Sequence, residues 1–385
     1  MPILHLSKEQ LRDTRYIRRA RVVLSFLAHY YIHSQPQPIS PAPSQRGKHD
    51  RESSDSFDDV LRAEEERGKY KTTIPASIAV SWCTVSDLLE LPPILTYADT
   101  VIWNWHLTEP SKGIQADNLS KTTTFSGTLT EHHFFKTSLL IELQGAQALK
   151  LIQQSLLSAV DPTEKTHHQL HLNLQELSKI IGIMVKIFVE ITSACAPSIF
   201  YWDVRTWFNG SDTSPTTYHS DGSILQEAGK GWTYQGITSK GDNLKVLTGP
   251  SAGQSSVIHA LDIFLGVDHT SNGIKESFMH RMQRFMPGPH SRYLTDLHDY
   301  LHAGVHATTK QQPHLIKSLC SQSSEDCLAA YNEAIATLSK LRDQHMRIVA
   351  LYILIPARQP PPPVPLSPLP PVLSLTRKLS PSGEW

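Results

Sequence analysis

Hydrophobic residues recur at spacings of three and four along most of this 385-residue chain, the pattern of helices that bury one face. The most regular stretch covers residues 328–355 and ends at Pro356, whose ring cannot continue a helix. Within the apolar segment 74–105, Pro92 and Pro93 end one helix and another begins after them. Further helices are expected over residues 11–32, 134–160, 172–196, 200–208, 255–265, 274–285 and 290–301. No alternating pattern of any length appears, so the predicted fold class is all-α.

Three segments interrupt the helical pattern and suggest how the chain is divided. Residues 34–73 are rich in proline, serine and charge and contain too little apolar surface to fold, which predicts a disordered insert. A loop with short strands is expected between residues 209 and 250. The proline-rich residues 358–385 are expected to form polyproline II helix or to be disordered. We therefore predict a smaller N-terminal domain at residues 1–122 and a large helical domain at residues 123–357, followed by the tail.

The overall composition argues against several classes of protein. Acidic and basic residues balance at 36 each, so neither nucleic acid nor a membrane surface is an expected partner. The four cysteines are scattered without a C-x-x-C pair, which argues against a disulfide scaffold and a structural zinc site. Residues 1–21 lack the apolar core of a signal peptide, and the most apolar stretch, 180–191, is interrupted by Lys186 and Glu190. These features predict a soluble cytoplasmic protein.

His345 lies in the last helical stretch, on one stripe with Leu338, Leu341, Val349 and Tyr352. A titratable ring among apolar side chains must be hydrogen-bonded or must ligate something. The helix by itself leaves two interpretations open. His345 is either a core histidine with a hydrogen-bond partner, or a neutral imidazole that ligates a metal such as haem iron.

Three other places carry polar residues whose role the local pattern leaves open. Ser251 and Gln254 have capping-box spacing before an apolar helix, or else their loop lets backbone amides approach a flat ligand. Ser138 stands among bulky apolar residues, where a serine hydroxyl usually bonds the carbonyl one turn back. Arg205 lies in the aromatic run IFYWDVRTWF and either packs along the surface or binds a carboxylate. No glycine-rich phosphate loop, G-x-S-x-G elbow or H-E-x-x-H motif accompanies them.

Six segments between residues 74 and 357 together resemble the indoleamine 2,3-dioxygenase family in its fungal form. In chain order they are LELPPILTYADTVIWNW, FFKTSLLIEL, IFYWDVRTWF, GPSAGQSSVIHALDIFLGV, MQRFMPGPHSRYL and LRDQHMRIVALYILIPA. The resemblance implies a helical domain that holds haem b, capped by a smaller N-terminal domain. It also implies an oxidoreductase that adds both atoms of O2 to L-tryptophan to give N-formylkynurenine, the first step of the kynurenine pathway. An electron donor that reduces the haem is implied as a partner.

The resemblance also carries the family's site residues onto this chain. His345 matches the proximal ligand of the haem iron, and Ser138 matches a serine of the distal pocket near the substrate and oxygen. Arg205 matches the residue that binds the substrate carboxylate. Asp262 and Arg342 match a buried acid–base pair near the proximal side. The other matches line the indole pocket, pack on the substrate or lie against the haem edge: Tyr97, Thr100, Val101, Phe134, Phe200, Ser251 and Ala252.

The chain departs from the family's pattern in four places. It begins where the small domain is already under way, so this domain is expected to be truncated. The insert 34–73 replaces a short connection, and Pro250 replaces a glycine. The proline-rich tail stands where the family has a glycine- and threonine-rich loop that closes over the substrate. Two alternatives to an active dioxygenase follow: a relative that binds haem for signalling without turnover, or a helical interaction protein whose tail docks in an SH3-type or WW-type groove.

Overall fold

The structure is a computed structural model. It describes residues 7, 9–35, 71–160, 163–213, 217–218, 224–226, 228–237, 244–267, 277–302, 314–360 and 362. Most of the predicted insert and tail lies outside the described residues, so these two predictions stay untested. The predicted division into domains also stays a prediction.

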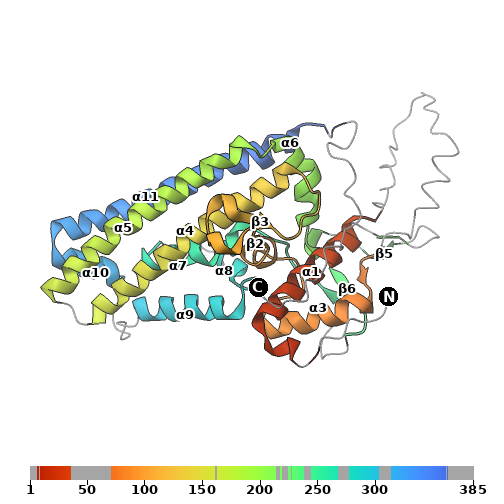
Figure 1. The fold of residues 1–385 in the computed structure, drawn as a ribbon, viewed down its shortest axis with the longest axis horizontal. Helices are drawn as coiled ribbons and strands as arrows, with labels where there is room; N and C mark the ends of the chain where they lie inside the picture. Colours follow the sequence, from red (N-terminus) through yellow and green to blue (C-terminus); the bar gives the residue numbers. More distant parts are fainter. Residues whose placement is uncertain are drawn as a thin grey trace, which may run out of the picture.

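Three long helices form the main body of the molecule. Helix α5 (Glu164–Val189) packs along both α4 (Leu129–Val160) and α11 (Glu325–Val349), and Figure 1 shows the three lying side by side. Their apolar stripes meet in one core, where Leu177 and Leu338 are almost fully buried. The hydrophobic period that predicts these helices is therefore the pattern of this core.

Shorter helices pack against the long ones and contribute further residues to this core. Helix α7 (Ser256–Phe264) packs against both α4 and α9 (Gly288–His302), and it buries Leu261 and Phe264. Helix α10 (Leu315–Ser323) packs against α5 and α11. Helix α8 (Phe278–Gln283) lies before α9 in the chain and contacts the loop that precedes α7.

A second core lies around α1 (Thr14–His33) and α3 (Ala76–Leu88), which pack against each other. Trp82 of α3 is fully buried there, together with Trp232. Figure 1 places α1 and α3 at one end of the three long helices, beside the short strand β6 (Trp232–Tyr234). The N-terminal helices thus form a compact unit against the end of the main body.

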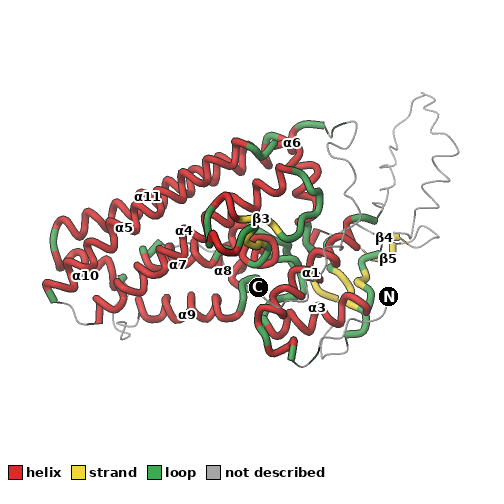
Figure 2. Tube along the Cα trace, viewed as in Figure 1, coloured by secondary structure: helices red, strands yellow, loops and turns green. Residues whose placement is uncertain are grey.

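The strands are short, and Figure 2 shows how little of the molecule they occupy. Strand β1 (Thr73–Ile74) runs parallel to β6, which pairs antiparallel with β7 (Leu244–Lys245). Two antiparallel pairs complete the described strands: β2 (Trp105–Leu107) with β3 (Leu119–Lys121), and β4 (Thr217–Tyr218) with β5 (Ile224–Gln226). Each described strand has two or three residues, which confirms the all-α fold class and the short strands expected between residues 209 and 250.

Short helical turns connect these elements. Most are 3-10 turns: η1 (Gln10–Arg12), η3 (Pro110–Lys112), η4 (Ala116–Asn118), η5 (Glu190–Ser193), η7 (Arg205–Phe208), η8 (Ser211–Thr213), η9 (Ala252–Gln254) and η11 (Pro356–Arg358). The one-turn α6 (Pro197–Ile199) precedes η7. The π-helical turns are η2 (Ala98–Ile102), η6 (Phe200–Val204) and η10 (Ala350–Leu354).

Helix caps explain where the structure departs from the sequence prediction. Helix α5 begins at residue 164 rather than at 172, because Thr163 and Thr166 form a capping box that starts the helix in a polar segment. Helix α10 was not predicted, and only Ser324 separates it from α11. The Ser324 hydroxyl accepts from the Cys327 amide at 3.1 Å and caps α11. Hydrophobic period does not detect such caps, so it misplaces helix starts.

No single helix among the described residues is long and apolar enough to cross a membrane. Two consecutive helical segments, Glu164–Ser193 and Pro197–Phe208, are together long and apolar enough for a span, but only by length and composition. They are bent by 92° relative to each other.

A buried ion pair joins α1 to the π-helical turn η2. The Arg21 guanidinium donates to the Asp99 carboxylate at 3.1 and 3.3 Å, and neither side chain is exposed to solvent. The same guanidinium donates to the carbonyls of Pro92 at 2.9 Å and Ile94 at 2.6 Å. Asp99 also accepts from the amide and the hydroxyl of Thr96, at 2.9 and 2.8 Å. Both charges are therefore paired with each other and hydrogen-bonded to groups of the protein.

Removing one partner of this pair is expected to destabilise the fold strongly. Arg21→Met leaves the Asp99 carboxylate buried without its cation, which costs about 3–5 kcal/mol of unfolding free energy. Lys112→Met is the control, because Lys112 and Glu109 form an ion pair in which both side chains are more than half exposed. Such a pair contributes less than about 1 kcal/mol. Urea unfolding of both variants tests this, and equal losses of stability would contradict it.

Candidate functional site

One face of α4 carries three chemically different residues at four-residue spacing: Phe134, Ser138 and Glu142. The Ser138 hydroxyl donates to the Phe134 carbonyl at 3.1 Å, the local bond expected for serine on an apolar helix face. The Glu142 carboxyl accepts from the Ser255 hydroxyl. Burial raises the pKa of Glu142, while hydrogen bonds from Ser255 and Tyr97 oppose that rise.

A cluster of aromatic rings joins this face to two distant segments. The rings of Phe134 and Phe200 lie 4.5 Å apart between centroids. Phe200 also meets Tyr352 edge-on at 5.7 Å, and Phe208 lies 6.2 Å from Phe134. Because Tyr352 follows α11, the cluster brings together α4, the segment 200–208 and the end of the helix that carries His345. The structure thus places Phe134 and Phe200, both predicted to line the site, in direct contact.

The predicted residues Tyr97, Thr100 and Val101 are all buried at η2. Tyr97 and Val101 belong to the same apolar cluster as Phe134. Burial raises the pKa of Tyr97, and the neighbouring Glu142 carboxyl, to which its hydroxyl bonds, raises it further. The Thr100 hydroxyl donates to a carbonyl of its own turn, that of Thr96, at 3.3 Å. Burial and the bond to Glu142 hold the Tyr97 side chain in place.

The π-helical turns that the structure describes all contribute to this region. Turn η2 carries Thr100 and Val101, turn η6 begins with Phe200, and turn η10 contains Tyr352. A π turn inserts one extra residue per turn and so re-aims side chains, and such turns are frequent at functional sites. Their gathering is structural evidence for a site that does not depend on the sequence prediction.

Arg205 lies where η6 passes into η7 and is half-buried. Its guanidinium stands over the Tyr201 ring, 5.4 Å from the centroid. No carboxylate among the described residues pairs with it. An arginine held on an aromatic ring without an anion partner is well suited to bind a carboxylate.

The loop that contains Ser251 and Ala252 is fixed by Gln254. The Gln254 side chain accepts from the Tyr97 amide at 2.8 Å and donates to the Gly249 carbonyl at 2.9 Å. The spacing of Ser251 and Gln254 predicted that Ser251 caps the apolar helix, but it does not. It caps the 3-10 turn η9, whereas Ser255 caps α7 by accepting from the Ile258 amide. The sequence prediction was wrong here because two caps follow each other within five residues.

His345 is half-buried on α11 and meets the Phe188 ring edge-on at 5.9 Å. Its stripe neighbours Leu338, Leu341 and Tyr352 are buried, as the pattern predicted. Within the described part of the chain, however, no hydrogen bond engages the imidazole. Burial lowers the pKa of His345 below its usual 6.5, so the ring is neutral at pH 7. The ring therefore remains available as a ligand.

The predicted pairing of Asp262 with Arg342 is present. The Asp262 carboxylate, 4% exposed, accepts a hydrogen bond from the Arg342 guanidinium. This ion pair joins α7 to α11 three residues before His345, and it limits how α11 can rotate or slide relative to α7.

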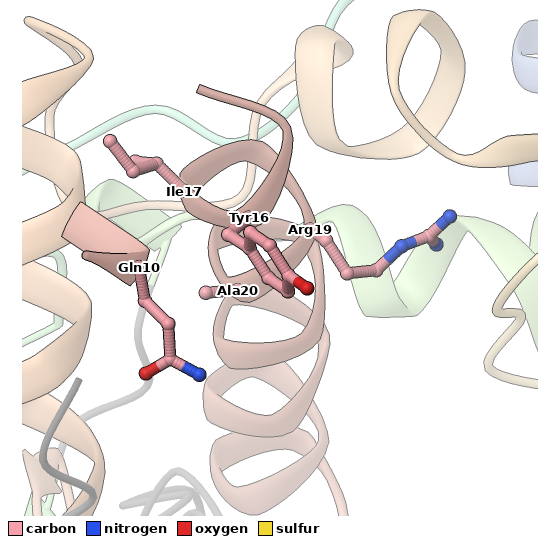
Figure 3. Close-up of a pocket in the computed structure, with 5 residues that line it drawn as sticks. All are labelled: Gln10, Tyr16, Ile17, Arg19 and Ala20. Carbon is pink, nitrogen blue, oxygen red and sulfur yellow. The ribbon is translucent and has the colours of Figure 1, made fainter. Parts of the chain in front are cut away.

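A small pocket lies elsewhere, on η1 and the first turns of α1 (Figure 3). Its lining residues are Gln10, Tyr16, Ile17, Arg19 and Ala20. None of the predicted site residues lines it, and it shares no element with the aromatic cluster described above.

The family model of indoleamine 2,3-dioxygenase matches residues 1–365. This chain belongs to the indoleamine 2,3-dioxygenase family. Membership confirms the resemblance found in the six sequence segments, and it agrees with the helical fold. The mouse and Aspergillus relatives of this chain are named as indoleamine 2,3-dioxygenases, which are oxidoreductases.

Similarity to individual family members is moderate. The chain is 30% identical over 295 residues to Indoleamine 2,3-dioxygenase 2 of Mus musculus, and 31% identical over 299 residues to Indoleamine 2,3-dioxygenase 1 of that species. Each match covers 76% of this chain, and the chain spans 64% and 65% of the two mouse proteins. It is 28% identical over 364 residues to Indoleamine 2,3-dioxygenase nanC of Aspergillus nanangensis, covering 92% of this chain and 74% of that protein.

Indoleamine 2,3-dioxygenases depend on haem, and the residues present fit this group. No group of three or more histidine, cysteine or acidic side chains in the described ranges could hold a bare metal ion. Haem needs fewer protein ligands, because the porphyrin itself supplies most of the donors and one protein side chain suffices. His345 meets the requirement, since its neutral imidazole is half-buried and makes no hydrogen bond to any of the residues that the structure describes.

Two residues at the site were not predicted from the sequence. Glu142 follows Ser138 by four residues, so the helical period could have placed it on the same face. Phe188 packs on His345 from α5, and no local pattern indicates a contact over so long a separation in the chain.

The raised pKa of Glu142 predicts a dependence of stability on pH. A carboxyl with a raised pKa in the folded state contributes stability below its unfolded pKa, near 4.5, and loses it as the pH rises through the folded pKa. Glu142→Gln keeps an oxygen that accepts from Ser255 but carries no charge. We expect the variant to gain stability relative to the unmodified protein as the pH rises above about 4.5.

Thermal unfolding between pH 4 and pH 8 measures this difference. The control is Glu176→Gln, because the Glu176 side chain is exposed on α5 and forms an ion pair with Lys179, which is also exposed. Parallel stability curves for Glu142→Gln and the unmodified protein would show that the Glu142 carboxyl does not titrate differently in the folded state.

Proposed function

We propose that this chain is a haem-dependent dioxygenase that cleaves the indole C2–C3 bond of L-tryptophan with O2 and forms N-formylkynurenine. This is the first step of the kynurenine pathway, and we expect it to take place in the cytoplasm. The observation that carries the proposal is the packed pair Phe134 and Phe200, which lies between the helix of Ser138 and the end of the helix of His345. An aromatic wall at this place suits a flat indole ring.

In this proposal His345 is the residue that would hold the haem iron. Its neutral imidazole would hold haem b, which when bound supplies the iron that activates O2. The ion pair of Asp262 with Arg342 keeps α11 in place beside α7, so the imidazole is presented from a fixed backbone. A separate electron donor would keep the iron in its reduced form.

Arg205 and the aromatic residues orient the substrate. The Arg205 guanidinium, held on Tyr201 and without an anion partner in the described residues, would bind the amino acid carboxylate. Phe134, Phe200 and Val101 would then confine the indole ring and keep water away from it. Fixing one end by charge and the other by shape leaves the ring few orientations, which favours a single reaction.

The side chains of this pocket offer positioning rather than strong acid–base chemistry. The Ser138 hydroxyl donates to the Phe134 carbonyl and retains acceptor capacity near the pocket. Ser138 and Arg205 are the two polar residues to which we assign a role in the reaction. Both oxygen atoms end in the product, so the reaction needs no external proton donor for a leaving group.

His345→Ala is expected to abolish haem binding, because no second side chain is proposed as an axial ligand. The reconstituted variant should lack the visible haem absorbance that the unmodified protein shows. His298→Ala is the control, since His298 is exposed on α9 and should leave haem binding unchanged. Full haem occupancy in His345→Ala would refute the ligand assignment.

The activity itself is tested with the reduced, haem-loaded protein, L-tryptophan and O2, following N-formylkynurenine. Absence of product at full haem loading would favour the alternative of a haem-binding relative without turnover.

Arg205→Leu should lower kcat/KM for L-tryptophan about 100-fold, because removing one partner of a hydrogen-bonded charge pair that is shielded from water typically costs about 2–5 kcal/mol or more. Turnover of tryptamine, which lacks the carboxylate, should change far less. Equal losses for both substrates would show that Arg205 does not bind the carboxylate.

A further inference from the structure

Helix α1 reaches both sides of the proposed substrate pocket. One side is the segment 95–101, which carries Val101, and the other is the segment 205–209, which begins with Arg205. We propose that His29 of α1 is a positioning residue that fixes the separation of these two walls. The inference rests on the proposed function, because that function places Val101 of one wall against the indole and Arg205 of the other wall at the carboxylate.

The side chain of His29 hydrogen-bonds to one backbone group of each wall. Its Nε2 accepts from the Leu95 amide at 3.1 Å. Since this amide can only donate, Nε2 must be unprotonated and the proton lies on Nδ1. Nδ1 therefore donates to the Trp207 carbonyl, 3.0 Å away. Two residues more than one hundred positions apart are thus joined through one imidazole ring.

The ring has little freedom to move. His29 is completely buried and meets the Trp232 ring edge-on at 5.0 Å and the Trp82 ring edge-on at 6.4 Å. The third ring against it is that of His33, at 5.4 Å. A side chain packed on three sides holds its two hydrogen-bond partners at a set distance.

His29 is also held in the one protonation state that can form both bonds. Burial lowers its pKa well below 6.5, and the nearby His33 and Arg21 lower it further, against a smaller opposing effect of the Trp207 carbonyl. A protonated ring would present an N–H to the Leu95 amide and lose that bond. The neutral form keeps both walls attached throughout the neutral pH range.

Arg21 and His33, two other polar residues of α1, each bond to one wall only. Arg21 bonds to the Ile94 carbonyl and to Asp99 on the first side. The Nε2 of His33 lies 2.9 Å from the Asn209 carbonyl on the second side. No hydrogen bond in the described part of the chain joins the two walls directly. Of these three residues, His29 is therefore the one whose loss would let the walls separate.

A change in the separation of the two walls should weaken substrate binding more than it slows the chemical step. A shift between Val101 and Arg205 misaligns the indole pocket with the carboxylate site, whereas the haem ligand His345 is on α11, outside both walls. We expect His29→Phe, which fills the same space without hydrogen bonds, to raise KM for L-tryptophan about tenfold or more. Haem content should be unchanged and kcat should fall less than KM rises.

Two variants serve as controls. His29→Gln offers one donor and one acceptor and should recover part of the lost affinity for L-tryptophan. His33→Phe removes a bond to one wall only and should change KM little. KM values for His29→Phe and His33→Phe that do not differ would overturn the proposal, as would KM for His29→Gln no better than for His29→Phe.

A measurement on the unmodified protein keeps the proposal testable if His29→Phe does not fold. In ¹⁵N NMR of the histidine-labelled protein, the signal absent from His29→Gln is that of His29. It should show a protonated Nδ1 and an unprotonated Nε2 with no titration between pH 5.5 and 8. A ring that titrates near 6.5 or carries its proton on Nε2 would refute the bridge. This result does not require turnover, so it is independent of a failure of the dioxygenase assay.

Discussion

The complete burial of one ion pair, Arg21 with Asp99, is the constraint on which the N-terminal part of this structure depends. Neither side chain is exposed, so folding must replace the water around both charges with protein donors and acceptors. The carbonyls of Pro92 and Ile94 and the amide of Thr96 complete that set. These bonds form only when α1 and the turn before η2 are in place together. We interpret the pair as a device that selects this one arrangement more than as a source of net stability.

The arrangement is passed on to the candidate site through other buried polar groups. Arg21 binds the carbonyls of Pro92 and Ile94, a few residues before Tyr97 in the chain. The Tyr97 amide in turn donates to the Gln254 side chain. Gln254 in turn holds the Gly249 carbonyl, which places the loop of Ser251. On its other side α1 reaches Trp207 through His29. Each of these groups would be costly to bury without its partner, so the order of one segment requires the order of the next.

At the end of this chain of contacts lies a region built for positioning. Three π turns contribute Val101, Phe200 and Tyr352 to one region. The ring of Phe134 packs on Phe200, and Arg205 supplies a cation held on Tyr201. Such a set can bind an aromatic amino acid but provides little acid–base chemistry of its own. This division agrees with a family in which the cofactor performs the difficult step and the protein binds, orients and shields the substrate.

Much of the fold could be predicted from the sequence, because a helix that buries one face repeats its apolar residues every three to four positions. This local property located α1, α7 and the helix of His345, and the ordered motifs named Asp262 and Arg342 as a pair before the structure showed it. Partners distant in the chain could not be predicted in this way. His29 bonds to residues 66 and 178 positions away, and Phe188 packs on His345 from another helix. The sequence by itself determined the helices and the residue types of the site. Only the tertiary structure decided which polar atoms find partners, since that depends on where separate helices pack and not on any repeat along the chain.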